Sequence, residues 1–343
     1  MNASEPQPST RPEFVWRDAG RIVVFRAGAV AEAPSVLAEH DFERFTLLST
    51  QRALHGNEPI AEAADRTVEV APDPVPEAAS SALEAAGAAQ QLVALGGGRV
   101  IDTAKAVAAV SGARVAAIPT TMSGAEMTGI HRLPAGREGQ ARGLVRPAVV
   151  IADPGPMTSL PEEPLRASSM NALAHGADSL YTPFANPVSK MCALRGAGLI
   201  AAALGAPRGS RDETALALGS LLCGYAIDSA LFALHHVVCQ TLVRVCGGSH
   251  AETNAAVLPE VIAAMRPRAP EEIRELAAAV GASAESLPDR LRQLGRPAGL
   301  GAAGADRARL EEALDAIQAR PQLGHTPDPP DREELRRIVE SAW

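Results

Sequence analysis

Short apolar runs alternate with Ala-rich, helix-like stretches over the first half of the chain. The apolar runs are rich in Val, Ile and Leu and are bounded by polar or turn-forming residues, which predicts strands. These strands are expected at 21–25, 45–50, 66–70, 91–96, 114–119 and 148–153. Helical stretches such as 30–39 and 76–89 lie between them. Strands that alternate with helices are typical of a parallel sheet flanked by helices, so we expect an α/β domain.

The pattern changes after a proline-rich segment near 154–163. From about residue 164 the chain is rich in Ala and Leu with helical periodicity and has few clusters of β-branched residues, which predicts an all-helical second domain. We therefore expect a flexible N-terminal arm at 1–20, an α/β domain at 21–158 and a helical catalytic domain at 159–343.

Composition and charge exclude several classes of function. A chain of 343 residues has room for two domains. The net charge of -8 leaves no basic surface to attract nucleic acid. Apolar residues are dispersed, without the uninterrupted run of about 20 that a membrane span needs, and the N-terminus lacks the pattern of a secretory signal. We expect a cytoplasmic protein whose partner is a small molecule or a peptide.

A strand, three glycines and a helix follow one another in LVALGGGRVIDTAKAVA, residues 92–108. Gly96, Gly97 and Gly98 let a ligand approach the backbone, and the N-terminus of the next helix favours an anion such as phosphate. A tight connection without a ligand remains an alternative, because the segment departs from GxGxxG and follows roughly the fourth strand. Asp102 is either a cofactor contact or a solvated residue at the helix start.

A second segment, residues 116–132, begins as a strand and becomes a loop dense in hydroxyl groups. Thr120, Thr121 and Thr128 are suited to hydrogen-bond a nucleotide without adding charge. Together with the glycine turn upstream, they favour a nucleotide site between the domains. Lys105, one of two lysines in the chain, lies either near the phosphate or at the surface.

Histidines gather in the predicted helical domain. Asn171 and His175 are four residues apart and share one face of a predicted helix, and His236 and His250 follow in later helical segments. Three histidines are suited to bind zinc or iron. The neutral amide of Asn171, however, supplies no charge to balance a dication. The pattern therefore leaves two alternatives, a weakened metal site or a cluster of proton-donating histidines.

Five segments resemble the iron-containing alcohol dehydrogenase superfamily in order and spacing, and most closely the maleylacetate reductases. They are LGGGRVIDTAK, AIPTTMSGAEMT, MNALAH, ALHHVVC and HAETNAAVLP. The resemblance spans roughly residues 21–343. It implies an α/β N-terminal dinucleotide-binding domain plus an all-α C-terminal domain, the dehydroquinate synthase-like fold, with a homodimer and an active site between the domains.

The resemblance also implies roles for the residues singled out above. The metal ligands of the metal-dependent members fall on Asn171, His175, His236 and His250. Maleylacetate reductases similarly carry Asn at the first position and are regarded as working without metal, so no metal is expected and the four residues are expected to be catalytic.

The same resemblance places the cofactor, with NAD preferred and NADP kept open because Arg52 lies near the expected ribose position. The implied contacts are Ser49, Thr50 and Asp73 on the adenosine side, Gly97 and Gly98 at the pyrophosphate, and Thr120, Thr121 and Thr128 towards the nicotinamide ribose.

Several residues depart from the reductase pattern. Arg99 replaces a Ser, Gln240 stands where another His is common, Asn254 and Glu260 replace histidines, and the loop 131–147 is unusual. The expected activity is metal-independent reduction of maleylacetate to 3-oxoadipate. The alternatives are a divergent biosynthetic dehydrogenase that oxidises a hydroxy acid or a peptide terminus, with or without decarboxylation, a metal-dependent alcohol dehydrogenase, and a nucleotide-binding protein without turnover.

Overall fold

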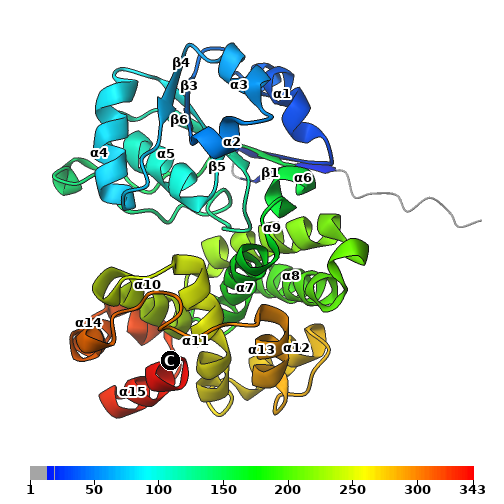
Figure 1. The fold of residues 1–343 in the computed structure, drawn as a ribbon, viewed down its shortest axis with the longest axis vertical. Helices are drawn as coiled ribbons and strands as arrows, with labels where there is room; N and C mark the ends of the chain where they lie inside the picture. The colour runs from blue at the N-terminus through cyan, green and yellow to red at the C-terminus, as the bar shows by residue number, and fades with distance from the viewer. Residues whose placement is uncertain (1–13, 19) are drawn as a thin grey trace, which may run out of the picture.

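A computed structural model describes residues 14–18 and 20–343 and shows an α/β half stacked on a helical half (Figure 1). The α/β half contains a seven-stranded sheet in the order β1-β2-β7-β6-β5-β3-β4, in which every neighbouring pair except β1 and β2 is parallel. Its strands are β1 (Phe14–Asp18), β2 (Arg21–Phe25), β3 (Thr46–Ser49), β4 (Arg66–Glu69), β5 (Gln91–Gly96), β6 (Arg114–Pro119) and β7 (Val149–Ala152). The six strands predicted from the sequence are confirmed within one residue at each end.

The first strand corrects one prediction. Residues 1–20 were expected to form a flexible arm, but Phe14–Asp18 form β1, which pairs antiparallel with β2 in the register Phe14↔Phe25 to Asp18↔Arg21. Aromatic and β-branched residues favour strands, and FVWRD carries three of them behind the polar, Pro-rich start of the chain. The arm prediction extended the character of that start too far. Its remaining part, residues 1–13, lies outside the described residues.

Helices cover both faces of the sheet because side chains alternate along each strand. In β5, Val93 and Leu95 pack with α1 (Ala33–Glu39), α2 (Gln51–Leu54) and α3 (Glu58–Ala63) on one face. The neighbouring residues Leu92 and Ala94 pack with α4 (Val75–Ala86) and α5 (Gly98–Ser111) on the other face.

The order of the strands locates the natural ligand crevice of the sheet. The chain passes from β3 outward to β4, returns to β5 beside β3, and then proceeds through β6 to β7. Open α/β sheets bind ligands at such a reversal, beyond the carboxyl ends of the strands. Thr50 follows β3, and the turn Gly96–Gly98 joins the last residue of β5 to the first of α5, so both lie at this edge.

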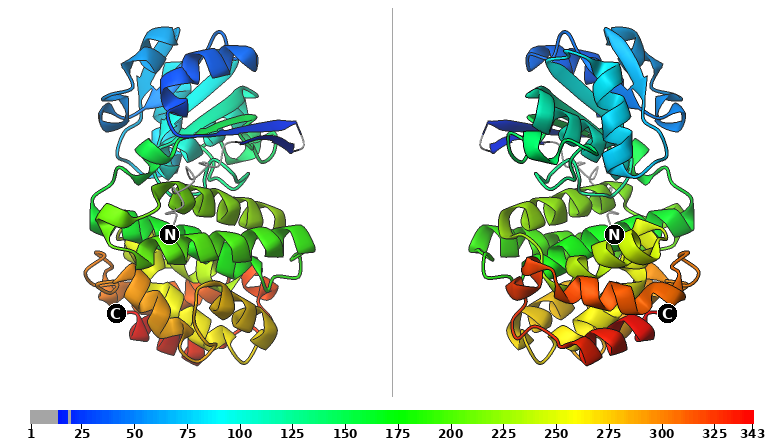
Figure 2. Two further views of the ribbon diagram at one scale, coloured as in Figure 1. Left: turned by 90° about the vertical axis from the view of Figure 1, so that its right-hand side faces the viewer. Right: turned by 90° about the vertical axis from the view of Figure 1, so that its left-hand side faces the viewer.

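The rest of the chain is mostly helical and begins with α6 (Pro154–Thr158) and α7 (Glu162–Ser179). Every residue of α7 from Leu165 to Ser179 is buried, because α8, α9 and α11 pack around it (Figures 1 and 2). The other helices are α8 (Pro187–Gly205), α9 (Glu213–Ala230), α10 (Leu234–Cys246), α11 (His250–Met265), α12 (Pro270–Ala279), α13 (Leu287–Gly295), α14 (Leu310–Gln318) and α15 (Arg332–Ser341).

Within the described residues, α8 is the one straight helix long and apolar enough to match a membrane span, and α9 and α10 match only as a pair bent by 99°. In this fold α8 packs against α7 and α9, and Gly196 and Gly219 allow a close approach. A Cβ added at Gly196 would lie 2.8 Å from the carbonyl oxygen of Gly219. Buried core helices meet the same length and hydropathy criterion, so it assigns no membrane role.

Candidate functional site

One face of α7 carries three polar side chains, Asn171, His175 and Asp178. Their spacing of four and then three residues aligns them along the helix. All three are buried, and Asp178 is 0% exposed. The structure therefore brings Asn171 and His175 together as predicted and adds a carboxylate that the sequence analysis missed. The signal was present in the sequence, because Asp178 continues the same helical face.

The carboxylate of Asp178 fixes the start of α10. It accepts hydrogen bonds from the backbone N–H groups of Ala233 (2.8 Å), His235 (3.2 Å) and His236 (3.2 Å). It also accepts one from the hydroxyl of Tyr181 (2.6 Å) and one from ring Nδ1 of His236 (3.0 Å). An anion at a helix N-terminus is favourable because the first N–H groups have no partners inside the helix.

These contacts keep Asp178 ionised. Burial alone raises the pKa of the carboxyl group, but the hydrogen bond and charge of His236, with smaller contributions from His235 and Tyr181, hold that pKa well below its usual range. Because Nδ1 of His236 donates to Asp178, its Nε2 points away from the pair. This Nε2 atom is buried and, among the described residues, has no hydrogen-bond partner. A buried polar atom without a partner is available to form a hydrogen bond with a ligand or to exchange a proton with it.

His175 stacks on His236. The ring centroids are 4.8 Å apart with an interplanar angle of 25°. Burial lowers the pKa of His175 well below its usual value, and the nearby His236 and His250 lower it further. His175 is therefore neutral at physiological pH. Its Nδ1 atom is buried without a partner among the described residues, as is Oδ1 of Asn171.

A loop of the α/β half closes over α7 at this point. The side-chain amide of Asn171 donates to the carbonyl of Ser123 at 3.4 Å. The next residue, Gly124, has φ +71°, and a Cβ there would lie 2.8 Å from Nδ1 of His175. Glycine is needed for both the conformation and the space. The hydroxyl-rich loop predicted to bind a nucleotide thus reaches the histidines.

His250, the first residue of α11, lies at the boundary of the two halves. Its side chain is exposed, yet the protein around it lowers its pKa to about 4, mainly by desolvation and then by the charge of His236, while Asp102 acts in the opposite direction. Asp102 belongs to α5, so His250 faces the helix that follows the glycine turn. At neutral pH the imidazole of His250 is uncharged.

The glycine turn packs directly against the hydroxyl-rich loop. A Cβ at Gly97 would lie 3.1 Å from Cγ2 of Thr121, and one at Gly98 would lie 2.9 Å from Cβ of Ser123. Gly97 is the N-cap residue of α5 and provides no side-chain cap, so the first N–H groups of the helix are open to a ligand. A Cβ at Gly96 would lie 2.7 Å from Val100. The predicted phosphate turn is therefore built as a compact unit.

Two of the predicted adenosine-side contacts, Ser49 and Thr50, have other partners in this structure. The hydroxyl of the buried Ser49 donates to the carbonyl of Leu95 at 2.8 Å, and Thr50 caps α2 by accepting from the N–H of Ala53 at 3.3 Å. Asp73 is exposed beyond β4. Thr120 lies buried at the end of β6. The cofactor roles of these residues stay predictions.

Lys105 is buried with 0% of its surface exposed, so the alternative that it is a surface charge is wrong. Its ammonium group donates to the carbonyls of Ala125 (2.9 Å), Thr128 (3.0 Å) and Ile130 (2.8 Å), and also to Oγ1 of Thr128 (3.3 Å). It also pairs with Asp102 at 2.7 Å. Lys105 thereby fastens the hydroxyl-rich loop to α5.

Glu126, in the same loop, is a second group that the sequence analysis missed. Its side chain is 0% exposed, and neither carboxyl oxygen has a hydrogen-bond partner among the described residues. Burial raises its pKa to about 7, against the smaller opposing effects of its own backbone N–H and of Lys105. The carboxyl group is therefore largely protonated below neutral pH.

Comparison with known proteins places this arrangement in a family. Residues 20–154 match the sequence profile described as iron-containing alcohol dehydrogenase, and residues 166–343 match that of the Fe-containing alcohol dehydrogenase family, C-terminal. The chain belongs to the iron-containing alcohol dehydrogenase family. It is accordingly an oxidoreductase.

Individual relatives support this family assignment. Maleylacetate reductase of Burkholderia cepacia is 34% identical over 264 residues, which is 73% of each chain. The crystal structure of maleylacetate reductase from Agrobacterium tumefaciens has a TM-score of 0.82 and 33% identity, covering 97% of this chain and 99% of that one. Sulfoacetaldehyde reductase from Bifidobacterium kashiwanohense, solved in complex with NAD+, shares the fold with a TM-score of 0.78 at 17% identity, covering 96% and 98%.

The family name implies iron, but the donor atoms present here do not fit a dication well. The amide of Asn171 and the rings of His175, His236 and His250 contribute no negative charge. Asp178 does not replace the missing carboxylate, because five donors already occupy it. Across residues 14–18 and 20–343, no three His, Cys, Asp or Glu side chains are grouped so as to hold a metal ion.

The residues that depart from the reductase pattern have structural partners. Asn254 accepts from Nε2 of His235 at 2.9 Å and donates to the carbonyl of His250 at 2.6 Å, so it joins two histidine-bearing helices. Glu260 pairs with Arg292 at 2.7 Å, and Arg99 donates to the carbonyl of Pro72 at 3.2 Å.

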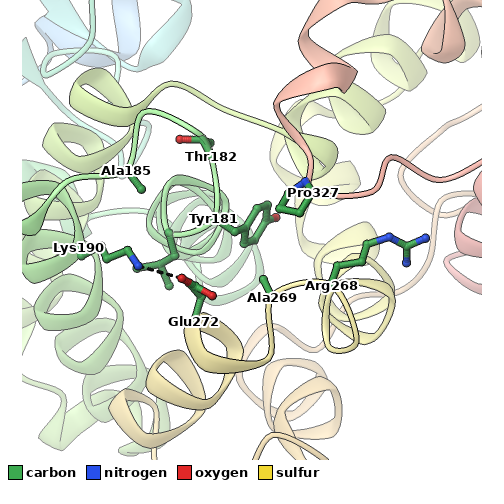
Figure 3. Close-up of a pocket in the computed structure, with 9 residues that line it drawn as sticks. Tyr181, Thr182, Ala185, Lys190, Arg268, Ala269, Glu272 and Pro327 are labelled. Atoms are coloured by element: carbon green, nitrogen blue, oxygen red, sulfur yellow. Dashed lines mark hydrogen bonds and ion pairs between the residues drawn. The ribbon is translucent and has the colours of Figure 1, made fainter.

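A separate hollow of about 230 Å³ lies on the helical half, with Tyr181, Lys190 and Arg268 in its lining (Figure 3). Tyr181 lines it and reaches Asp178 from that side. Its cations are neutralised, because Lys190 pairs with Glu272 at 2.9 Å and Arg268 pairs with Glu334 at 2.6 Å. Among the described residues that line the hollow, none has a buried side-chain nitrogen or oxygen without a hydrogen-bond partner, unlike those of the histidine cluster.

Proposed function

We propose that this oxidoreductase reduces maleylacetate, or a closely related carboxylic acid, with a nicotinamide cofactor and without a metal. The observation that carries the proposal is the buried Asp178–His236 pair, whose unpartnered Nε2 lies in a cluster with His175 and Asn171. The similarity to maleylacetate reductases supports the choice of substrate.

The cofactor is expected at the switch point of the sheet. Gly97 and Gly98 with the start of α5 are suited to its pyrophosphate, and Thr120, Thr121 and Thr128 lie on the loop that leads towards His175. NAD+ is bound by sulfoacetaldehyde reductase, which shares the fold, so NAD is preferred and NADP is the alternative. When bound, the nicotinamide ring supplies or accepts the hydride.

The proton is assigned to His236. Its Nδ1–H is held by the ionised Asp178, which stabilises positive charge on the ring and leaves Nε2 to give or take a proton. His175 and His250 are neutral at physiological pH, so they and Asn171 are suited to orient the substrate by hydrogen bonds. Reduction of maleylacetate then adds a hydride to one carbon of the double bond and a proton to the product, giving 3-oxoadipate.

The test is a substrate screen followed by NADH and NADPH absorbance. Maleylacetate is tried first and hydroxy acids next, at several pH values from about 5 to 8, the span over which histidine changes charge. We expect NADH to be consumed with maleylacetate. Absence of consumption at every pH would refute the substrate, and oxidation of a hydroxy acid in the same screen would favour the divergent dehydrogenase instead.

A further inference from the structure

Arg320 lies in the connection between α14 and the 3-10 helix at Pro321–His325, and it reaches back to α10. Its Nη2 donates to Oε1 of Gln240 at 3.0 Å and its Nη1 to Oγ1 of Thr241 at 3.5 Å. Its guanidinium carbon stands 5.7 Å from the centre of the Phe232 ring. These three contacts fix the position of the guanidinium group along α10, between Phe232 just before the helix and Gln240 and Thr241 in its middle.

This position is next to the proposed proton donor. Gln240 follows His236 by four residues on α10, so the two share one helical face, about 6 Å apart along the helix axis. On the other side of His236, the centre of the Phe232 ring lies 6.1 Å from the centre of the His236 ring. Arg320 therefore contacts residues on both sides of His236.

The guanidinium group has no counter-ion. None of the carboxylates in the described part of the chain forms an ion pair with Arg320, whereas other arginines of the helical half, such as Arg268 and Arg336, are paired with glutamates. Its partially buried surroundings and the charge of Arg244 both disfavour the cation and lower the pKa of Arg320. A confined positive charge without an anion is costly, which points to an anion that arrives with a ligand.

Gln240 explains why the charge stays available. Its amide oxygen orients the guanidinium group of Arg320 without neutralising it. A guanidinium group has five N–H donors, and Gln240 and Thr241 take one each, so N–H groups remain for a planar, two-oxygen partner.

We propose that Arg320, oriented by Gln240, binds a carboxylate of the substrate beside His236. The inference rests on the proposed hydride transfer for the identity of the reacting group. It restricts the substrate to acids whose carboxylate lies about 6 Å from that group, the rise of four helical residues. Neutral alcohols and aldehydes lack the group that Arg320 recognises.

The kinetic test compares an acid that the wild-type enzyme accepts with the neutral methyl ester of the same acid. In Arg320→Gln, KM for the acid is expected to rise about 10- to 100-fold, the effect of one charged hydrogen bond, with kcat and the KM values for NADH and NADPH little changed. The ester should not respond, and Arg320→Lys should recover part of the loss. Arg292→Gln, which removes an ion-paired arginine of α13, is the matched control.

A binding test separates this inference from the proposed function. Succinate, a dicarboxylate that cannot accept a hydride, is titrated calorimetrically into the enzyme with and without NADH. Its dissociation constant is expected to rise about 10-fold or more in Arg320→Gln and to stay unchanged in Arg292→Gln. If no substrate is turned over but this pattern holds, only the proposed function fails.

Three results would overturn the role of Arg320. The first is that the wild type does not bind succinate, or that Arg320→Gln leaves its dissociation constant unchanged. The second is that Arg320→Gln raises KM equally for the acid and its ester. The third is that Arg320→Gln raises only KM for NADPH. The last would place the anion on the cofactor instead of the substrate.

Discussion

Replacing Asp178 by Asn is expected to lower kcat by about 10²- to 10⁴-fold, the usual contribution of a positioned general acid. Asn cannot stabilise positive charge on His236, and its amide allows the other ring tautomer, in which Nε2 carries the proton and Nδ1 does not. The measurement is the pH profile of kcat together with the dissociation constant of NADH. The profile should lose the limb that reports the proton donor, while NADH binding stays unchanged.

Tyr181→Phe is the matched control for this variant. It removes one hydrogen bond to Oδ1 of Asp178 and leaves the contact between Oδ2 and His236 intact. We expect its kcat to stay within about threefold of the wild type, since Oδ1 keeps the N–H of His235 and the oxygen that holds His236 is untouched. If both variants lost activity equally and kept the wild-type pH profile, Asp178 would be a structural residue only.

The stability of the protein is expected to fall as the pH rises through the titration range of Glu126. The folded-state pKa of about 7 lies above the ordinary 4.5, so between these values the folded state holds a proton that the unfolded state has lost. Because stability falls where the folded state binds more protons, Glu126 lowers the free energy of unfolding by about 3 kcal/mol between pH 4.5 and pH 8.

Glu126→Gln removes this cost, since the amide is neutral at every pH. The gain of the variant over the wild type, measured by chemical unfolding, should be small near pH 4.5 and approach about 3 kcal/mol at pH 8. Glu43→Gln, at an exposed position of the same half, is the control and should show no such trend. A pH-independent difference between Glu126→Gln and the wild type would show that the buried carboxyl does not titrate in this range.

The strands and the glycine turn were predictable because their signal is local. Apolar runs bounded by turns located six strands to within a residue, and three glycines between a strand and a helix identified the turn that follows β5. β1 was missed because a polar start hid a short strand that is defined only by its pairing with β2.

The groups around the site were harder to predict because their roles arise from distant segments. Asp178 shares a helical face with His175, but its function depends on its contacts with α10. That helix starts more than fifty residues later, with its first N–H groups and His236 bound to the Asp178 carboxylate. Lys105 looked like a charge in an Ala-rich helix, and only the fold shows that it is buried against three carbonyls. Arg320 meets Gln240 across a gap of 80 residues, which no local pattern reports.

The most direct test of a metal-free, histidine-driven reduction is the NADH-dependent turnover of maleylacetate by the enzyme before and after chelation, with bound iron and zinc measured in the same samples. We expect less than about 0.1 metal ion per chain and a rate unchanged within about twofold, because the neutral donor set of Asn171 and the histidines does not balance a dication. One iron or zinc per chain, with turnover lost on its removal and restored on its return, would contradict the account.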